Sequence, residues 1–463
     1  MSALILISVL GVLVLYVGLF GRKDMLAPVG ILGVLGAIAL FATGWHIPHE
    51  LLGGMLEFDG FSTGFSLAML AITLLVFLFG PDYYARMANN VAEQYALMLF
   101  SLCGGILLTA YNNMLMLFLG IEVLSIPLYV LAGGKKYSLR SNEAALKYFL
   151  LGAFATAFLL MGIALLYGLT GSFDMGVLAK HIAEAGTGSA LLRFGIFFVV
   201  AGLAFKLGAV PLHFWVPDVY HGAPTLVTIF MATVVKMAAI AGFFRFVDIT
   251  GMPDPLARIL VLLTLATMLV GNISALRQTN FKRLMAYSSV SHAGFMLLAL
   301  LSDSGTETGN GADVGRTLLY YSFTYALATA GLFILFIIAK RANNGDEHHQ
   351  IFRGLFQTKP WLALCGLAML LSLAGIPLTA GFVAKYQVFL LAIGADWLKV
   401  MGFGVLMALL GIYYYIMVAR ELFMASEEPV TFTVSPLNGL VIAACTIGVL
   451  LLGIWPQLVG VWA

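Results

Sequence analysis

Charge is what this 463-residue sequence has least of: only 10% of its residues are Asp, Glu, Lys or Arg, whereas 61% are hydrophobic. Ordinary soluble domains carry about 25% charged residues, so the composition excludes a soluble globular chain. The formal net charge is +2, which does not favour a nucleic-acid partner. The composition instead predicts a protein that crosses a membrane many times.

Cysteine is also scarce. Cys103, Cys365 and Cys445 each stand alone in an apolar run, and no C-x-x-C or C-x-x-C-H pattern occurs. This scarcity removes a disulfide framework, an iron–sulfur site and a c-type haem from consideration. We therefore expect this chain to bind no cofactor and no metal ion of its own.

Long apolar runs are abundant, and a run of about 20 residues is enough to span the hydrocarbon as a helix. We predict an all-α, polytopic membrane protein with about fourteen transmembrane helices. No basic residue precedes the first run, so we expect it to remain as a span and not to be cleaved. The expected segments are 2–20, 25–43, 60–80, 93–110, 113–132, 143–168, 191–220 (interrupted), 224–247, 256–276, 281–301, 315–340, 360–394 (interrupted), 397–422 and 435–457.

Basic residues gather in the odd-numbered connections between these segments. Of the 24 Lys and Arg residues, about fourteen lie in odd-numbered loops and about six in even-numbered loops. The positive-inside rule then predicts cytoplasmic odd loops, with both termini on the periplasmic side of a bacterial inner membrane. The remaining basic residues lie within the segments themselves, and they are Lys147, Lys206, Lys236 and Lys385.

Two short patterns recur in the same order in the two halves of the chain. KLGAVPL (206–212) is similar to SLAGIPL (372–378), and GAFATAF (152–158) is similar to YALATAG (325–331). The pair of matches indicates a duplicated unit of five helices, and an odd number of spans inverts the second unit. We predict discontinuous helices 7 and 12 within four regions: helices 1–3 in 1–92, the first repeat in 93–248, the inverted repeat in 249–424 and the last helix in 425–463.

Ionisable groups inside the spans carry the functional hypothesis. An ionised side chain at the bilayer centre costs about 2.5 to 3.5 kcal/mol, so the four lysines and Glu122 need partners or water. Pro211 and Pro377 each free backbone carbonyls, which is tolerated only beside protein or a wet cavity. Lys206 lies five residues before the first proline and Lys385 eight residues after the second. Both lysines are therefore expected to reach a hydrated break.

A buried lysine beside one carboxylate holds its proton when the two groups are close and releases it when they separate. A variable distance between Glu122 and Lys206 would therefore make a proton carrier. Other polar residues that can bridge the gaps are His213, His221, Thr228, Thr233, Tyr287, Ser288, Ser289, Ser291 and His292.

Plain structural interpretations stay open beside this one. Glu122 and Lys206 can form an ion pair that only joins two helices. Lys147 follows Glu143 by one helical turn, and it can pair with that residue or extend to the membrane interface. His292 lies 170 residues after Glu122 at the same place in the repeat, and it can be either a hydrogen-bonded core residue or a proton relay.

Three stretches resemble a known family. They are FKLGAVPLHFWVPDVYHGAPT (205–225), FKRLMAYSSVSHAGF (281–295) and LAGIPLTAGFVAKYQVF (373–389). They resemble the signatures of the antiporter-like membrane subunits of respiratory complex I, the proton-pumping NADH:quinone oxidoreductase. The sequence departs from the usual pattern at Val216, His221 and Leu226, none of which is in the set of charged residues.

The resemblance implies a hydrated proton path along the membrane midplane, and the family's residues fall on Glu122, Lys206, Lys236 and Lys385, with Lys147 matching a further lysine. It also implies a non-redox translocase subunit that lies among other membrane subunits, including homologous antiporter-like ones, and lipids. Partner subunits would hold NAD, FMN, iron–sulfur clusters and quinone. Two other classes remain: a subunit of a Mrp-type Na⁺/H⁺ antiporter, and a purely architectural subunit.

Overall fold

The computed structural model describes residues 2–20, 23–43, 49–85, 91–186, 188–302, 311–426 and 430–460. Two basic residues of the odd-numbered loops, Arg22 and Arg86, lie outside these ranges. The described residues are almost entirely helical. Because 61% of the sequence is hydrophobic, helices that satisfy their own backbone hydrogen bonds are the form that suits an apolar surrounding.

The N-terminal region contains three long helices and one small hairpin. The elements are α1 (Ser2–Leu19), α2 (Lys23–Thr43), β1 (His49–Leu51), β2 (Leu56–Phe58) and α3 (Gly60–Tyr84). The two strands pair antiparallel, with Glu50 opposite Glu57, so the all-α prediction omits this short hairpin. Asp59 caps α3 by accepting a hydrogen bond from the Ser62 amide at 2.8 Å, as is usual at a helix start.

The remaining helices follow in two series. The first comprises α4 (Val91–Ala110), α5 (Met114–Ala132), α6 (Leu139–Thr170), α7 (Met175–Ala185), α8 (Ala190–Leu207), α9 (Trp215–Gly222), α10 (Thr225–Phe230), the π-helical η1 (Met231–Val235) and α11 (Lys236–Thr250). The second comprises α12 (Asp254–Leu276), α13 (Phe281–Leu301), α14 (Gly311–Ala342), the 3₁₀ turn η2 (His349–Phe352), α15 (Leu355–Thr358), α16 (Pro360–Ala374), α17 (Ala380–Gly394), α18 (Leu398–Phe423), α19 (Pro436–Ile454) and α20 (Gln457–Gly460).

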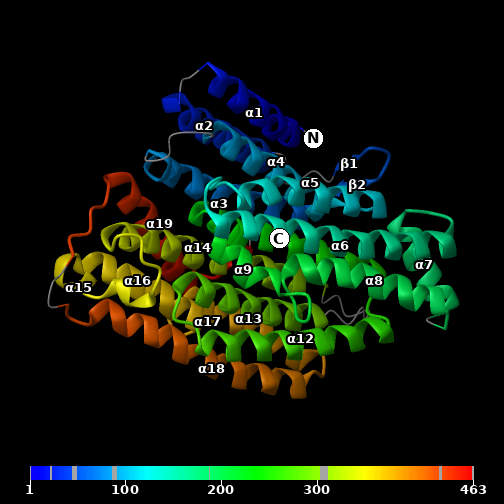
Figure 1. Ribbon diagram of the computed structural model, residues 1–463. Helices are drawn as coiled ribbons and strands as arrows, with labels where there is room; N and C mark the ends of the chain where they lie inside the picture. The colour runs from blue at the N-terminus through cyan, green and yellow to red at the C-terminus, as the bar shows by residue number, and fades with distance from the viewer. Residues whose placement is uncertain are drawn as a thin grey trace.

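The protein is a multi-pass membrane protein. Within the described ranges, 13 helices are long and apolar enough to cross a membrane, and α16 and α17 are shorter apolar helices. The helices differ in how much of them is buried. The most apolar stretches of Thr225–Thr250 and Asp313–Ala342 are 100% buried inside the protein, whereas that of α1 is 28% buried. Figure 1 shows α1 and α2 along one edge of the bundle and α18 along the opposite edge. The count of fourteen spans and the inverted repeat stay predictions.

Both predicted breaks are present, and glycine makes each of them. Gly208 with φ of 81° directly follows the last residue of α8, and Gly375 with φ of 83° directly follows the last residue of α16. Glycine adopts this left-handed conformation without the steric cost that other residues meet, so it ends a helix cleanly. Pro211 and Pro377 follow within three residues and prevent the helix from resuming at once.

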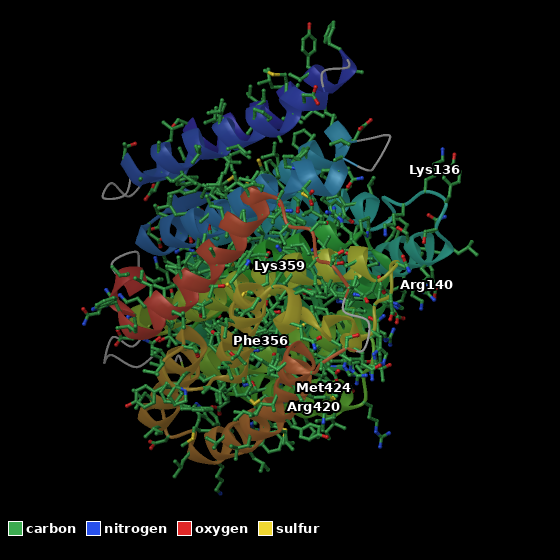
Figure 2. All side chains as sticks on the ribbon, turned by 90° about the vertical axis from the view of Figure 1, so that its left-hand side faces the viewer. Lys136, Arg140, Phe356, Lys359, Arg420 and Met424 are labelled. Atoms are coloured by element: carbon green, nitrogen blue, oxygen red, sulfur yellow. The ribbon has the colours of Figure 1, made fainter. Side chains whose placement is uncertain are left out.

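Connections of the same parity meet at the same end of the bundle. At one end, Arg245 near the end of α11 pairs with Asp59 before α3 at 2.7 Å and donates to the Thr109 carbonyl at the end of α4. At the other end, Arg341 of α14 pairs with Asp82 of α3. Figure 2, viewed from the left-hand side of Figure 1, labels four basic residues of odd-numbered loops, namely Lys136, Arg140, Lys359 and Arg420.

Candidate functional site

Lys206 of α8 contacts the part of α5 that contains Glu122, but the two residues do not form an ion pair. Glu122 is half-buried, and its Oε1 accepts a hydrogen bond from Thr156 Oγ1 of α6 at 2.7 Å. Lys206 lies in the last turn of α8 and donates to Ser125 Oγ at 2.8 Å and to the Tyr148 hydroxyl at 3.2 Å. Ser125 follows Glu122 by three residues, so both lie on one face of α5.

A very small cavity lies beside Lys206, where α5, α6 and α8 meet. It has a volume of about 10 Å³, and Ser125, Thr156 and Lys206 all contribute to its lining. This volume is close to the space that one water needs. The structural ion pair of Glu122 with Lys206 is absent from the described contacts, although the carboxylate charge acts on the lysine. The geometry is therefore that of a pair held apart.

Lys236 lies deep in the bundle with only neutral partners. It begins α11 directly after η1, is 4% exposed, and donates to the backbone oxygen and Oγ of Ser289 in α13. Its ammonium also lies 5.8 Å from the ring centroid of Tyr325. None of the described carboxylates pairs with it. A buried charge without a counter-charge is costly, so this position is unusual for a lysine with a purely structural role.

Lys385 binds the free backbone carbonyl groups at the second helix break. Its Nζ, on α17, donates to the carbonyl oxygens of Leu373 at 3.1 Å and Ala374 at 2.8 Å, which are the last residues of α16. A positive charge is favoured at a helix C-terminus, where carbonyls lack partners. Gly375 makes room for this side chain, because a Cβ there would lie 2.9 Å from Lys385 Cδ. Lys385 is 6% exposed, so it faces the protein interior and not lipid.

His292 connects the environments of the last two lysines. Its Nδ1 lies 2.8 Å from the Tyr321 hydroxyl and its Nε2 lies 3.0 Å from the Tyr415 hydroxyl, which also contacts Ser288. The charges of both Lys236 and Lys385 act on the imidazole. This chain of hydroxyl and imidazole groups is able to pass a proton, because each member both donates and accepts. The residues come from α13, α14 and α18.

Other predicted site residues lie elsewhere. His213 lies between α8 and α9, where its ring packs against Phe214 and its buried Nδ1 has no partner among the described atoms. Lys147 is at the odd-loop end and pairs with Glu143 and Asp218, each at 2.7 Å. Of the two alternatives left open for Lys147, the structure has the pairing with Glu143. Its role in a proton path stays a prediction, as do the roles of the other site residues.

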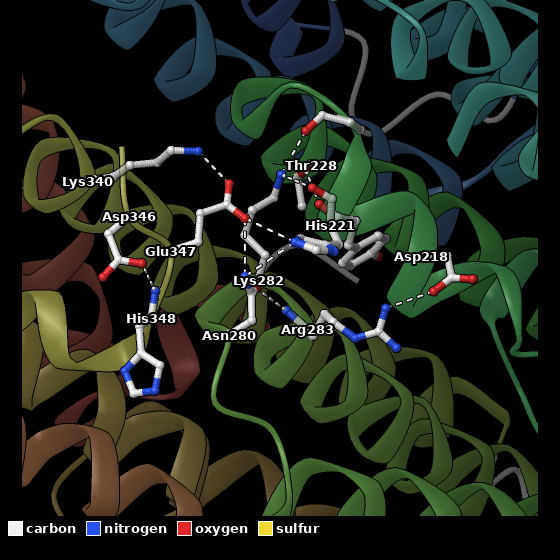
Figure 3. Close-up of polar contacts among 12 residues, drawn as sticks. Asp218, His221, Thr228, Asn280, Lys282, Arg283, Lys340, Asp346, Glu347 and His348 are labelled. Atoms are coloured by element: carbon white, nitrogen blue, oxygen red, sulfur yellow. Dashed lines mark hydrogen bonds and ion pairs between the residues drawn. The ribbon is translucent and has the colours of Figure 1, made fainter. Parts of the chain in front are cut away.

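His221 belongs to a polar cluster at the odd-loop end. Its Nε2 lies 3.2 Å from Glu347 Oε2, and Asn280 contacts both side chains. Lys282 donates to the carbonyls of His221 and Ala223 at the end of α9. Figure 3 shows Glu347 at the centre of these contacts. The cluster lines a cavity of about 340 Å³, to which Lys135, Arg140 and Lys340 also contribute.

The Glu347 carboxyl is strongly biased towards its charged form. Burial raises its pKa, but the hydrogen bond from His221 and the charges of Lys282 and Lys340 outweigh that effect, so the pKa lies well below the usual glutamate range. Burial and the charge of Lys340 also lower the pKa of the neighbouring Lys135, which favours the neutral form of that lysine. The Glu347 carboxyl is therefore charged at neutral pH.

Glu347→Gln is expected to destabilise the protein by about 2 kcal/mol at pH 7, because it removes the charge that Lys340 and His221 share. A lowered folded-state pKa contributes stability above the unfolded value of about 4.3, and that contribution is lost as the pH falls further. The difference from wild type should thus be present at neutral pH and shrink below about 4. Thermal unfolding of the detergent-purified protein checks this, with the exposed Glu184→Gln as control. A pH-independent difference would contradict it.

Several residues of the site escape sequence reasoning. Thr156, Tyr148 and Tyr321 touch the charged residues, yet each stands in an apolar run like many other residues of its type. Thr156 gave one usable indication, because it lies inside the repeated Ala-x-Ala-Thr-Ala pattern. Thr233 was predicted as a bridge but donates to the carbonyl of Ile229 in its own helix.

Comparison with known proteins places this fold in a family. A family model described as "NADH:quinone oxidoreductase/Mrp antiporter, TM" matches residues 111–411, more than half of the chain. The chain belongs to this family. Within the NADH:quinone oxidoreductase/Mrp antiporter family, the NADH-quinone oxidoreductase subunit N of Cytophaga hutchinsonii is 39% identical over an alignment that covers 99% of this chain and 98% of its own length. The segment PDVYHGAP and a lysine on helix 12 also resemble subunit N.

Solved structures of the NADH:quinone oxidoreductase/Mrp antiporter family agree in fold. A chain of respiratory complex I from Thermus thermophilus with bound aureothin superposes with a TM-score of 0.84 at 33% identity, covering 99% of this chain and 98% of that chain. A chain of the Mrp complex from Dietzia sp. superposes with a TM-score of 0.83 at 20% identity, covering 99% and 95%. The second likeness is one of fold alone.

Proposed function

We propose that this chain is a proton-translocating membrane subunit of an NADH:quinone oxidoreductase. The observation that carries the proposal is the burial of Lys206, Lys236 and Lys385, each 4 to 6% exposed and each bonded only to neutral groups within the described part of the chain. Structural lysines in a bilayer are expected beside carboxylates or at the interface. Three unpaired ammonium groups in the interior support a relay and not a scaffold.

In the proposed cycle, a change that arrives from a neighbouring subunit alters the distance between Glu122 and Lys206. When the carboxylate approaches, Lys206 holds its proton, and when it withdraws, the proton is free to leave. The proton passes to Lys236, which contacts Ser289, and then through water and the Tyr415 and His292 side chains to Lys385, from which it leaves on the opposite side. Reloading takes place from the side of the odd-numbered loops. Conformational coupling, and not electron transfer, is thus the work of this chain.

The same proposal assigns partners and position. The chain binds no cofactor, while partner subunits hold NAD, FMN, iron–sulfur clusters and quinone, and homologous antiporter-like subunits and lipids surround it. Nucleic acid has no part in this assembly. The protein lies in the bacterial inner membrane, with the odd-loop end in the cytoplasm and both termini on the periplasmic side. The basic residues of the odd-numbered loops support this orientation.

A Mrp-type Na⁺/H⁺ antiporter subunit is the alternative, because the same fold occurs there. The identity of 39% with subunit N against 20% with the Mrp chain favours the oxidoreductase. The two differ in what drives transport. In liposomes that contain the purified complex and no sodium, NADH with quinone should acidify one compartment. A requirement for sodium, without NADH oxidation, would identify the antiporter.

Glu122→Gln is expected to lower NADH-driven proton translocation about tenfold, because a neutral amide cannot control the Lys206 proton. The complex should assemble normally, since glutamine still accepts the Thr156 hydrogen bond. Proton uptake per NADH in proteoliposomes measures the effect, and Glu93→Gln, an exposed carboxyl in the first turn of α4, is the control. Normal pumping by the Glu122 variant would assign the chain a purely architectural role.

A further inference from the structure

Thr156 is the only described side chain that hydrogen-bonds Glu122, and it lies on a different helix. Its Oγ1 donates to Glu122 Oε1 at 2.7 Å, from α6 to α5. A hydrogen bond from a neutral donor to a carboxylate is stronger than one between neutral groups. The rotamer of Glu122 is therefore set by α6, and not by Lys206 on α8.

The arrangement around Lys206 fits a carboxylate that is held back. Ser125 and Tyr148 receive the ammonium hydrogen bonds. The single-water cavity lies between Thr156 and Lys206 and is lined by both. A change of the Glu122 rotamer towards Lys206, beside this cavity, would replace the Thr156 hydrogen bond with an ion pair. The Glu122 carboxylate therefore has two competing partners, the Thr156 hydroxyl and the Lys206 ammonium group.

The second half of the chain provides an internal comparison. Thr329 of α14 occupies the position that corresponds to Thr156 in the repeated Ala-x-Ala-Thr-Ala pattern. Its Oγ1 is fully buried and has no partner among the described atoms. His292, which corresponds to Glu122, bonds instead to Tyr321 and Tyr415. Among the described residues, the threonine hydroxyl holds a carboxylate only in the first half of the chain.

We infer that Thr156 is a positioning residue that holds the Glu122 carboxylate away from Lys206 and so sets when that lysine releases its proton. This inference rests on the proposed function and adds a residue to it. With the hydroxyl bonded, Glu122 is withdrawn and the lysine proton is free to leave. When the bond breaks, Glu122 pairs with Lys206 and the proton is retained.

The test uses the assembled complex in proteoliposomes, with NADH and quinone, and compares Thr156→Val with Thr156→Ser. Valine has the shape of threonine but no hydroxyl, whereas serine keeps it. Thr156→Val should slow proton translocation about tenfold at pH 7, and the pH profile of translocation should move upward by about one unit, because the paired lysine keeps its proton to higher pH. Thr156→Ser should behave as wild type.

Thr329→Val is the matched control, since it removes the corresponding hydroxyl where no carboxylate is held, and its pH profile should not move. An unchanged rate and profile for Thr156→Val would overturn the inference. Equal impairment of the Ser and Val variants would also overturn it, because packing and not the hydroxyl would then matter. These outcomes differ from failure of the proposed function, in which Glu122→Gln itself pumps normally.

Discussion

Replacing Lys236 with methionine is expected to stop proton translocation while leaving the subunit assembled. Methionine has an unbranched stem of similar length and fills the space of the lysine, but it carries no proton. Among the described residues the side chain hydrogen-bonds to Ser289 alone, so its loss leaves one hydroxyl and one carbonyl without a donor. That cost of about 1 to 3 kcal/mol is offset by removal of an unpaired buried charge.

The effect on proton transfer should be large because α11 contains no second lysine that could replace Lys236. The most apolar stretch of this span is also 100% buried. Loss of a positioned proton carrier costs on the order of 100-fold or more in rate. Proton uptake and quinone reduction are measured together in proteoliposomes, and assembly is checked by the yield of intact complex. Lys180→Met, on the peripheral α7, should be silent. Wild-type pumping by Lys236→Met would remove this residue from the path.

The positions of the helix breaks and of the intramembrane charges are predictable from the sequence, whereas the hydrogen-bond partners of the charged residues are not. Pro211 and Pro377 mark where a helix cannot continue, and this is a local property of the chain. The positive φ at Gly208 and Gly375 follows from the same local rule. By contrast, α7 was not predicted, because it is 11 residues long and polar on one face, and a search for apolar spans overlooks such a helix.

The partner of Lys206 shows where sequence reasoning ends. Glu122 was the expected partner because it is the carboxylate in a neighbouring span, but the hydrogen bonds go to Ser125 and Tyr148. Which of several polar groups a lysine contacts depends on rotamers and on the space between helices. Those are set by residues 58 to 81 positions away. A single sequence contains no direct record of such contacts.

The cluster at the odd-loop end was overlooked for a similar reason. Lys282 and Lys340 were counted as positive-inside anchors, which describes their side of the membrane and not their contacts. In the folded chain, Lys282 caps the end of α9 and Lys340 pairs with Glu347. Residues from four separate loops meet only after the helices pack. His221 thereby gains a carboxylate partner that its own neighbourhood in the sequence does not contain.

Lys385 differs from Lys206 and Lys236 because its charge also supports the fold. It donates to the final carbonyls of α16, so Lys385→Met leaves two buried acceptors without donors, at a cost of about 1 to 3 kcal/mol each. This variant is expected to lose proton translocation and to lower the melting temperature of the complex. On its own it does not separate the two roles.

Lys385→Arg separates them. Arginine keeps a positive charge and several donors at the helix end, but it does not release a proton at accessible pH. We expect this variant to retain most of the thermal stability and yet to pump about 100-fold more slowly, as slowly as the methionine variant. Melting of the purified complex and proton uptake per NADH are measured side by side, with the exposed-loop variant Lys359→Met as control. If the arginine variant pumps at the wild-type rate, Lys385 only holds the broken helix together, and the proton leaves by another group.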